Sequence, residues 1–397
     1  MTDPVLAVGV DAGCCVRCVI CRLYDSRLEL LGYGEAPARG WNRSRIADQN
    51  SVSSAIREAV AEAERLAQVS VEAAVVGIGG AAVAGGHHRG VYEFGRPRDI
   101  EPGDLRYAFE RATRLRLEDH RLLLQAFPQD FTVDGRAGYR NPRGVRCARL
   151  EANVYAITAD LQDHQFLVSA VHQAHLAVEE TVFEGVAAAY AAVLPDERGR
   201  GVAVVDIGMQ STELAVYDGD ALVAAASIPI GGEHLTRDLA ICLSTSMEDA
   251  EMLKRDYGCA LLGLTGDDNL VEIPSHDGRP PREATRRQVN VILEARAEEL
   301  LEYVRAEVAQ AQMEQSLLEG VVLCGGGAKL SGMCDLAERI LNCQARNGLA
   351  IGIRNWPEEI NNTEWTVAAG LSMYSARLKQ KLGSRRRAPG IVGMVVR

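Results

Sequence analysis

The stretch VAVVDIGMQSTELAVY, residues 202–217, decides the fold of this chain. Its two apolar runs predict β-strands, and Asp206-Ile207-Gly208 lies at the bend between them. Residues 5–21 repeat the arrangement, with Asp11-Ala12-Gly13 at the bend. This repeat, at a distance of about 200 residues in the chain, indicates two structurally related halves.

The two turns carry the residue types that bind a polyphosphate. A glycine lets the backbone approach a ligand closely, and successive N–H groups at a turn attract an anion. An aspartate beside such a turn can hold a metal ion, often through water. We therefore expect Gly13, Gly208 and Ser211 to contact phosphates, and Asp11 and Asp206 to hold a metal ion through water. Taken singly, an Asp-x-Gly sequence usually marks an ordinary turn.

A third glycine-rich segment follows the apolar run 321–324. Gly325, Gly326 and Gly327 come next, and the chain then enters a predicted helix. A turn of this kind lets a flat ligand group lie against the backbone. Close packing of the helix on its strand is the alternative reason for these glycines.

The remaining segments alternate between strand and helix patterns, which predicts an α/β fold. Apolar residues recur at helical spacing in four segments, 51–67, 161–182, 248–257 and 284–318. Residues 80–161 differ, because they are rich in Gly, Arg and Pro and contain short β-like runs. We interpret them as a small inserted domain.

Charge is distributed unevenly along the 397 residues. The net charge of −11 argues against a nucleic-acid-binding surface over the whole protein. The last 21 residues contain seven Lys or Arg and no acid, whereas the rest of the chain carries −18. This basic end predicts an electrostatic anchor. No signal peptide or apolar run of about 18 residues is evident, and the ten cysteines are typical of reduced cytosolic thiols.

Four groups of motifs together resemble the FtsA family of bacterial cell-division proteins, within the actin, hexokinase and Hsp70 superfamily. They lie at 120–144, 203–232, 249–282 and 323–371, and so span nearly the whole chain. The most specific sequences are GRPPR at 278–282 and FPQDF at 127–131. The resemblance implies an actin-like, two-domain α/β fold with an inserted small α+β subdomain.

By the same resemblance the chain divides into subdomains and a tail. Subdomain 1A would comprise residues 1–79, 162–195 and 353–376, and subdomain 1C would be the insertion 80–161. Subdomain 2A would comprise residues 196–235 and 312–352, and subdomain 2B residues 236–311. Residues 377–397 would form a basic membrane-targeting tail. Because Pro389 and Gly390 interrupt the tail, we expect no long helix through 383–390. The tail residues expected at the membrane are Arg385, Arg386, Arg387, Ile391, Val392, Met394, Val395 and Val396.

The resemblance also implies binding of ATP with Mg²⁺. On the adenosine side the expected residues are Gly231, Gly232, Glu251, Lys254, Gly325, Gly326 and Gly327. The phosphate side departs from the family, because Cys14-Cys15 follow Gly13 where Thr and Lys are usual, and Met209-Gln210 replace glycines of the second loop. Since Met209 and Gln210 resist positive φ, we expect a weakened phosphate clamp and weak or vestigial ATP binding.

The function implied by the resemblance is that of an adaptor of the division ring, which is not an enzyme and has at most weak ATPase activity. The chain would polymerise like actin, bind the C-terminal peptide of FtsZ through Arg282, Arg286 and Arg287, attach to an anionic membrane surface, and recruit later division proteins. It would act at the cytoplasmic face of the inner membrane at the division site, without binding nucleic acid. A PilM-like pilus-assembly scaffold and an ATPase or kinase of the actin superfamily are the alternatives.

Overall fold

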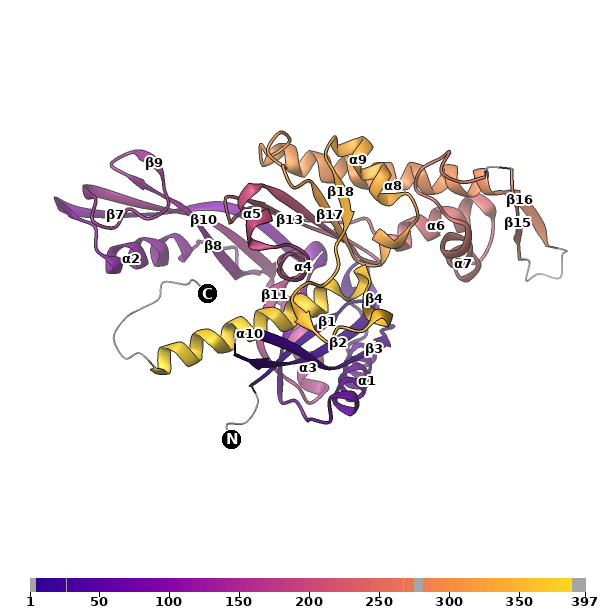
Figure 1. Cartoon of the computed structure of the whole chain (residues 1–397), viewed down its shortest axis with the longest axis horizontal. Coiled ribbons are helices and arrows are strands. Elements are labelled where there is room, and N and C mark those ends of the chain that lie inside the picture. The colour runs from indigo at the N-terminus through magenta and orange to yellow at the C-terminus, as the bar shows by residue number, and fades with distance from the viewer. Residues whose placement is uncertain (1–4, 26, 267, 275–280, 388–397) are drawn as a thin grey trace.

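The computed structural model describes residues 5–25, 27–266, 268–274 and 281–387, with side chains as far as residue 381. Two large domains lie against each other, and a smaller insertion projects from one side of them (Figure 1). Each large domain combines a mixed sheet with helices, which confirms the expected α/β fold.

The first domain is built on a six-stranded sheet. Its strands, in spatial order, are β11 (Ala177–Phe183), β6 (Ala73–Ile78), β1 (Val5–Ala12), β2 (Cys15–Tyr24), β3 (Arg27–Pro37) and β19 (Ile353–Arg354). β1 and β2 form the first predicted hairpin, in which Asp11 pairs with Arg17. α1 (Gln49–Ala67) covers one face of the sheet, next to β2 and β3, and α10 (Thr366–Arg387) covers the other, next to β1.

The second domain repeats this plan on a five-stranded sheet. Its strands, in spatial order, are β14 (Ala221–Ile228), β13 (Thr212–Asp218), β12 (Val202–Ile207), β17 (Val321–Cys324) and β18 (Ala345–Asn347). β12 and β13 form the second predicted hairpin, and β12 also pairs parallel to β17, as β1 pairs parallel to β6. The shared hairpin and parallel neighbour confirm the internal repeat.

Helices and a small hairpin complete the second domain. The helices are α6 (Gly232–Leu243), α7 (Met247–Tyr257), α8 (Arg286–Gln310) and α9 (Met333–Leu341). Their inner faces, including Leu239 and Leu293, form one buried core with β12 and β13. Each fully buried Leu stabilises the fold by about 1.5–3 kcal/mol. β15 (Leu270–Ile273) and β16 (Arg282–Thr285) form a hairpin at the end of the molecule furthest from the insertion (Figure 1).

The insertion is a four-stranded antiparallel sheet covered by one helix. Its strands, in spatial order, are β7 (Val83–Asp99), β10 (Arg146–Asp160), β8 (Arg121–Val133) and β9 (Arg136–Tyr139), and the helix is α2 (Pro102–Thr113). The sheet also packs against β14 of the second domain. There the Tyr155 hydroxyl donates to the Ala225 carbonyl at 3.1 Å and accepts from the Ala225 N–H at 2.8 Å. The insertion is therefore anchored to both large domains.

Two of the four predicted helices have different extents. Segment 161–182 divides into α3 (Leu161–Gln173) and β11, because residues 177–183 pair with β6 and continue the first sheet. Segment 284–318 begins with the end of β16, and α8 starts only after Thr285, whose side chain accepts the Gln288 N–H, and ends at Gln310. α1 starts after Asp48, which caps the N–H groups of residues 50 and 51.

The C-terminal helix is longer than expected. α10 continues through Gly383 to Arg387, so the expectation of no long helix through 383–390 is wrong for residues 383–387. The helix can tolerate Gly383, at a cost of about 1 kcal/mol relative to Ala, because its first turns are packed on β1 and α4 (Glu184–Ala192). Ile391, Val392, Met394, Val395 and Val396 lie outside the described residues. Within the part that the structure describes, no helix is long and apolar enough to cross a membrane.

Candidate functional site

A cavity of about 1120 Å³ opens between the two large domains, and we call it the cleft. The turns of both predicted hairpins, the first turn of α6, one face of α7 and the loop after β17 all line it. The predicted nucleotide residues found in its wall are Asp11, Gly13, Asp206, Gly208, Ser211, Gly232, Glu251, Lys254, Gly325, Gly326 and Gly327. The structure thus brings together groups that lie more than 300 residues apart.

Gly231 is the predicted nucleotide residue that does not line the cleft. It lies behind the wall, where a Cβ would approach the carbonyl oxygens of Gly208 and Met209 to 2.7 Å. Next to it, the N–H of Gly232 donates to the Gly208 carbonyl at 2.9 Å, and the N–H of Glu233 donates to the Met209 carbonyl at 2.7 Å. Gly231 therefore lets the second phosphate turn pack directly on the start of α6.

The floor of the cleft is acidic. Asp11 and Asp206 are joined there by Glu184, at the start of α4, and by Glu213, which pairs with Asp206 in the β12–β13 register. The sequence reasoning missed both glutamates. Glu213 lies within the stretch that indicated the fold, and an acid in an otherwise apolar strand was the available signal for it.

Burial controls the protonation of these carboxyl groups. Burial, reinforced by Asp11 and Glu213, raises the pKa of Asp206 to about 8. Burial also raises the pKa of Asp11 to about 6, although Arg17 and the Gly13 N–H oppose the shift. The pKa of Glu184 is raised well above its usual range by burial and the three neighbouring acids. At neutral pH the floor therefore holds protons that an incoming cation would displace.

The donor set of this floor is compatible with a divalent cation held through water. Glu213 Oε2 is buried without a hydrogen-bond partner, while its Oε1 accepts from the Gly80 N–H at 2.8 Å and from the Ser227 hydroxyl at 3.0 Å. Hard carboxylate oxygens of this kind suit Mg²⁺. Among the described residues, however, no group of three or more His, Cys, Asp or Glu is arranged to hold a metal ion directly.

Arg17, the cation nearest the first turn, is occupied by acids of its own domain. Its guanidinium lies 3.3 Å from Glu35 and 3.6 Å from Glu364, and it stacks on the ring of Trp365 at 5.7 Å. Trp365 in turn packs edge-on against Tyr33. Arg17 is thus held at the side wall rather than extended toward a phosphate.

The predicted adenosine side of the cleft is built around Lys254. Its ammonium group donates to Glu251 at 2.6 Å, to the Thr236 hydroxyl at 2.8 Å and to the Gly232 carbonyl at 3.1 Å. This network lowers the pKa of Glu251 against the opposing effect of burial, and it ties α7 to the start of α6. Lys254 and Glu251 therefore form a rigid wall of the pocket.

The loop after β17 approaches the acidic floor at Gly325. This residue has φ 79°, and a Cβ on it would lie 2.6 Å from Asp206 Oδ1 and 2.5 Å from the Ile207 carbonyl oxygen. Only glycine fits both the backbone conformation and the space. Gly325 thus serves close packing on the end of β12 as well as lining the cleft.

The turn between β12 and β13 forms without positive φ at Met209 or Gln210, so these two side chains do not strain it. The Gly208 N–H instead donates to the Ser211 carbonyl at 3.0 Å, which closes the turn between β12 and β13. Met209 points outward and is 54% exposed. The Gln210 side chain accepts from the Ser44 N–H at 2.7 Å and donates to Glu233 at 2.8 Å.

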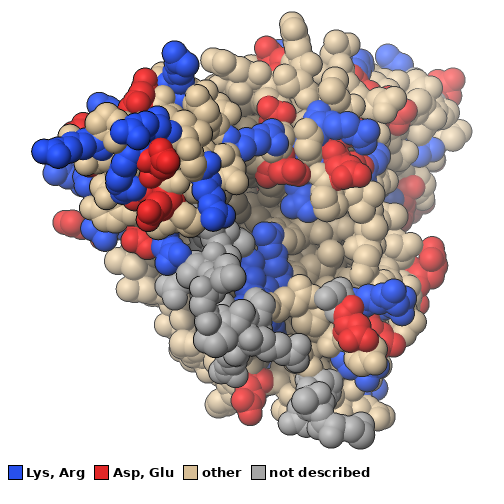
Figure 2. All heavy atoms as spheres, turned by 60° about the vertical axis from the view of Figure 1, so that its left-hand side comes forward, with Lys and Arg blue, Asp and Glu red and all other residues tan. Residues whose placement is uncertain are grey.

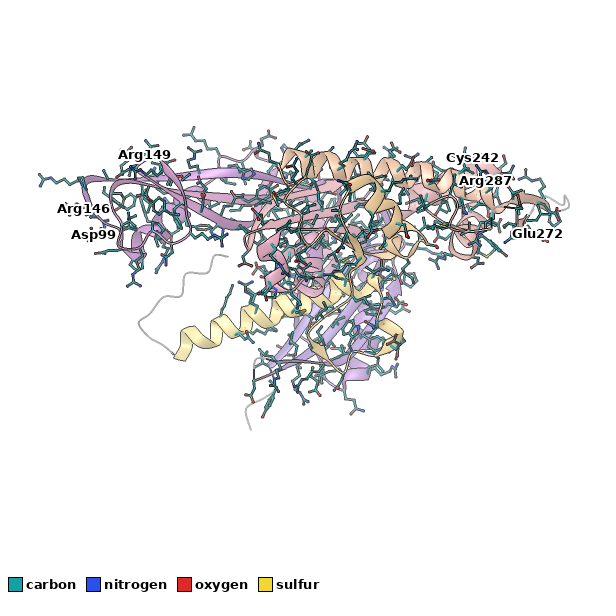
Figure 3. All side chains as sticks on the ribbon, turned by 45° about the horizontal axis from the view of Figure 1, so that its top comes forward. Asp99, Arg146, Arg149, Cys242, Glu272 and Arg287 are labelled. Carbon is teal, nitrogen blue, oxygen red and sulfur yellow. The ribbon has the colours of Figure 1, made fainter. Side chains whose placement is uncertain are left out.

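The predicted partner-binding arginines lie at the far end of the second domain, where Arg287 is labelled in Figure 3. Arg282, in β16, donates to the carbonyls of Leu243 and Ser244, and Arg286 donates to the Tyr257 carbonyl at 2.8 Å. These two arginines therefore also hold the β15–β16 hairpin and the start of α8 to the ends of α6 and α7. Arg286 additionally lines the cleft.

Comparison with known proteins places this architecture in a family. A family model described as cell division protein FtsA matches residues 203–370, and a model described as the SHS2 domain inserted in FtsA matches residues 80–158. The chain is 32% identical over 354 residues to FtsA of Pseudomonas aeruginosa, which covers 88% of this chain and 84% of that protein. It is 31% identical over 382 residues to FtsA of Escherichia coli K12, which covers 94% and 91%.

Solved structures with the same fold have lower identity. The PilM-PilN type IV pilus biogenesis complex matches 94% of this chain and 99% of that chain, with a TM-score of 0.68 and 18% identity. MreB5 of Spiroplasma citri bound to ADP matches 95% and 98%, with a TM-score of 0.57 and 12% identity. These likenesses confirm the actin-like fold. Because family models match both the second domain and the insertion, and relatives above 30% identity extend over most of its length, the chain belongs to the FtsA family of cell division proteins.

Proposed function

We propose that the protein is an adaptor of the division ring that polymerises, binds the C-terminal peptide of FtsZ and holds it at the cytoplasmic face of the inner membrane. In this proposal it also recruits later division proteins at the division site. Membership in the FtsA family is the observation that carries the proposal, because it covers the nucleotide cleft and the insertion together. The long body offers three separate regions for this work: the insertion, the far end of the second domain, and α10 (Figure 1).

In this adaptor, ATP with Mg²⁺ is a weakly bound regulatory ligand rather than a rapidly consumed substrate. The cleft supports this, because two cations that line it are already engaged within the protein: Lys254 donates to Glu251, and Arg17 forms ion pairs with Glu35 and Glu364. The cleft wall also contains eleven Asp or Glu against six Lys or Arg, so a polyphosphate enters against net negative charge unless a cation accompanies it. We expect calorimetry to show ATP binding that weakens sharply when Mg²⁺ is removed.

Charge also supports self-association through the insertion. Residues 80–161 contain thirteen Arg, no Lys and eleven Asp or Glu, a net charge of +2, whereas the rest of the chain carries −13. Figure 2, with the insertion's side of the molecule turned forward, shows basic side chains gathered over that part of the surface. The exposed arginines of the insertion that make no ion pair within the described chain are Arg96, Arg106, Arg111, Arg114, Arg116, Arg136, Arg140, Arg143 and Arg146. They complement an acidic neighbour in an open filament.

The test of the adaptor function is recovery of FtsZ from a mixture of purified proteins. We expect the full chain to retain FtsZ, and FtsZ lacking its C-terminal peptide to pass through. Retention of both forms equally, or of neither, would contradict the proposal.

A pilus-assembly scaffold and an actin-superfamily ATPase or kinase are the alternatives. The likeness to the PilM-PilN complex concerns the fold, at 18% identity. ATP turnover measured on the same preparation separates the adaptor from an enzyme, because fast turnover needs phosphate contacts that this cleft does not offer freely.

A further inference from the structure

The side chain of Gln210 crosses the cleft between the two large domains. Gln210, in the β12–β13 turn of the second domain, accepts through Oε1 from the Ser44 N–H at 2.7 Å. Through Nε2 it donates to Glu233 Oε2 at 2.8 Å, in the first turn of α6. Ser44 belongs to the first domain, at the turn between β4 (Trp41–Asn42) and β5 (Arg45–Ile46). The carboxamide of Gln210 thus ties the two walls of the cleft together at this end, while the Lys329–Glu364 ion pair (3.0 Å) joins them at the loop after β17.

Both ends of this bridge are held in place by other groups. Arg43 and Ser44 have φ 49° and 58°, the conformation of a two-residue type I′ turn. Gly80 lies directly beneath Ser44, since a Cβ on Gly80 would be 2.6 Å from the Ser44 Cβ. On the other side, Arg237 pairs with Glu233 from one turn further along α6. Because the groups at both ends are preorganised, closing the bridge costs little conformational entropy.

The bridge stands in the path that a phosphate chain has to take. An adenine placed near Lys254 and the Gly325–Gly327 loop must direct its phosphates between the two hairpin turns, which face each other across the cleft. Burial raises the pKa of the Cys14 thiol, in the opposite turn, to about 12, and the charge of Glu233 is the next largest cause. The Glu233 carboxylate is therefore close to the first turn as well as bonded to Gln210. It presents a negative charge to each arriving phosphate.

We propose that Gln210 is a specificity-determining residue, which straps the phosphate end of the cleft closed. Adenosine and AMP occupy the cleft with the strap in place, whereas a nucleoside triphosphate enters only by breaking both hydrogen bonds of Gln210. This inference rests on the nucleotide binding proposed above. Breaking the two hydrogen bonds of Gln210 costs free energy that corresponds to about a tenfold change in affinity. The strap therefore lowers the affinity for ATP by that factor relative to a cleft without it.

The first experiment is calorimetric titration of the full chain with adenosine, ADP and ATP in excess Mg²⁺. Gln210→Ala removes the strap, and Glu233→Ala removes its partner on α6. Gln315→Ala is the matched control, because this exposed glutamine lies outside the cleft. We expect Gln210→Ala to bind ATP about tenfold more tightly, with adenosine affinity unchanged within twofold. A loss of ATP affinity, or an equal change for adenosine and ATP, would overturn the proposal.

The second experiment measures the strap without any nucleotide. Amide hydrogen exchange at Ser44 should be slow in the natural chain and in Gln315→Ala, and about tenfold faster in Gln210→Ala. Unchanged exchange in a folded Gln210→Ala protein would show that the strap does not exist. If no form binds an adenine nucleotide, the proposed nucleotide binding has failed, and exchange at Ser44 still decides the strap. Should Gln210→Ala not fold, Glu233→Ala serves in both measurements.

Discussion

At the scale of single residues, Asp206 links the stability of the fold to pH. Its pKa is raised from 3.8 to about 8 by burial, with Asp11 and Glu213 adding to the shift. Between these two pH values the folded chain keeps a proton that the unfolded chain has released. The contribution of this group to stability is therefore fully present at low pH and is lost as the pH rises through about 8.

Asp206→Asn keeps the shape of the side chain and removes its charge. We expect the variant to gain free energy of unfolding relative to the natural chain, by a few kcal/mol more at pH 8.5 than at pH 5, since each pKa unit corresponds to about 1.4 kcal/mol. Urea unfolding at the two pH values measures this. Asp119→Asn, at an exposed loop position, is the control, and its free energy of unfolding should differ from that of the natural chain by the same small amount at both pH values. An offset in Asp206→Asn that does not depend on pH would contradict the prediction.

Gly325 and Gly326 offer a matched pair for testing the loop after β17. Gly325→Ala meets both a left-handed backbone and the Ile207 and Asp206 oxygens, and we expect it to lower the free energy of unfolding by about 3 kcal/mol. At Gly326 the nearest atom to an added Cβ is the flexible Glu364 carboxylate at 3.3 Å, so Gly326→Ala should cost less than about 1 kcal/mol. Equal losses in the two variants, measured by urea unfolding, would argue against this account of the loop.

The sequence predicted the glycines and aspartates of the cleft because turn chemistry is local. Gly13 and Gly208 follow an aspartate at a predicted bend, and each could be recognised from a few neighbouring residues. Glu213 and Gln210 could not, because what defines them is a partner elsewhere in the chain. Glu213 bonds to Gly80 and Gln210 to Ser44, across 133 and 166 residues. No periodicity or spacing encodes such contacts.

At the scale of elements, the start of α8 is where we place the FtsZ peptide. Replacing Arg282, Arg286 and Arg287 by Ala should slow association of the peptide, because basic groups at the rim of an interface mainly accelerate encounter. Arg305→Ala, near the other end of the same helix and 52% exposed, is the control for loss of one positive charge and is compared with each single variant. Peptide titration and stopped-flow binding measure the effect, and an unchanged association rate in the triple variant would refute this site.

The structure adds a requirement to that experiment. Arg282 and Arg286 donate to backbone carbonyls of neighbouring elements, so their loss also weakens the β15–β16 hairpin. Thermal unfolding of each single variant therefore has to accompany the titration. Slower binding at unchanged melting temperature is the result that assigns the effect of a variant to the interface.

The end of α10 is the element that we expect to reach the membrane. Arg385, Arg386 and Arg387 continue the helix, and each basic residue near an anionic surface contributes about 1 kcal/mol. A chain ending at Gly383 should therefore bind anionic vesicles at least a hundredfold more weakly than the intact chain. Salt should release the intact chain from these vesicles. Flotation with anionic and with uncharged vesicles provides the comparison. Equal flotation of both chains would remove the tail from the proposed function.

Element boundaries were predicted well where capping and periodicity agree, and poorly where pairing decides. The predicted helix 248–257 differs from α7 by one residue, and Ser246 caps α7 as a local signal. Residues 177–182, in contrast, fall within the predicted helix 161–182. They form a strand because β6, about 100 residues earlier, offers a parallel partner.

At the scale of the whole molecule, the insertion and the start of α8, where we propose that the FtsZ peptide binds, lie at opposite ends. Figure 3 places Asp99, Arg146 and Arg149 at one end and Arg287, Cys242 and Glu272 at the other. A partner at one end therefore leaves the opposite end accessible. This separation allows filament formation and FtsZ binding to be tested independently.

Deleting residues 80–161 tests the filament. The two ends of the insertion are adjacent, since Val83 pairs with Ala159, so a short linker can close the gap. We expect the shortened chain to bind FtsZ peptide as before but to lose ordered filaments in sedimentation on lipid. Because the deletion also uncovers β14, a second variant with Arg106, Arg111 and Arg114 changed to Ala should show the same loss. Ordered filaments formed equally by the shortened and intact chains would contradict the prediction.

The placement of the tryptophans has a practical consequence. The chain has three Trp, and two of them belong to the cleft region: Trp41 lines the cavity, and Trp365 is stacked against Arg17. A guanidinium on an indole face and a change in solvent contact both alter indole emission. Intrinsic fluorescence should therefore follow occupancy of the cleft in the unlabelled protein. Trp365→Phe leaves the signal of Trp41, in the hairpin beside the strap, and Trp41→Phe leaves the signal of Trp365, in the wall beside Arg17.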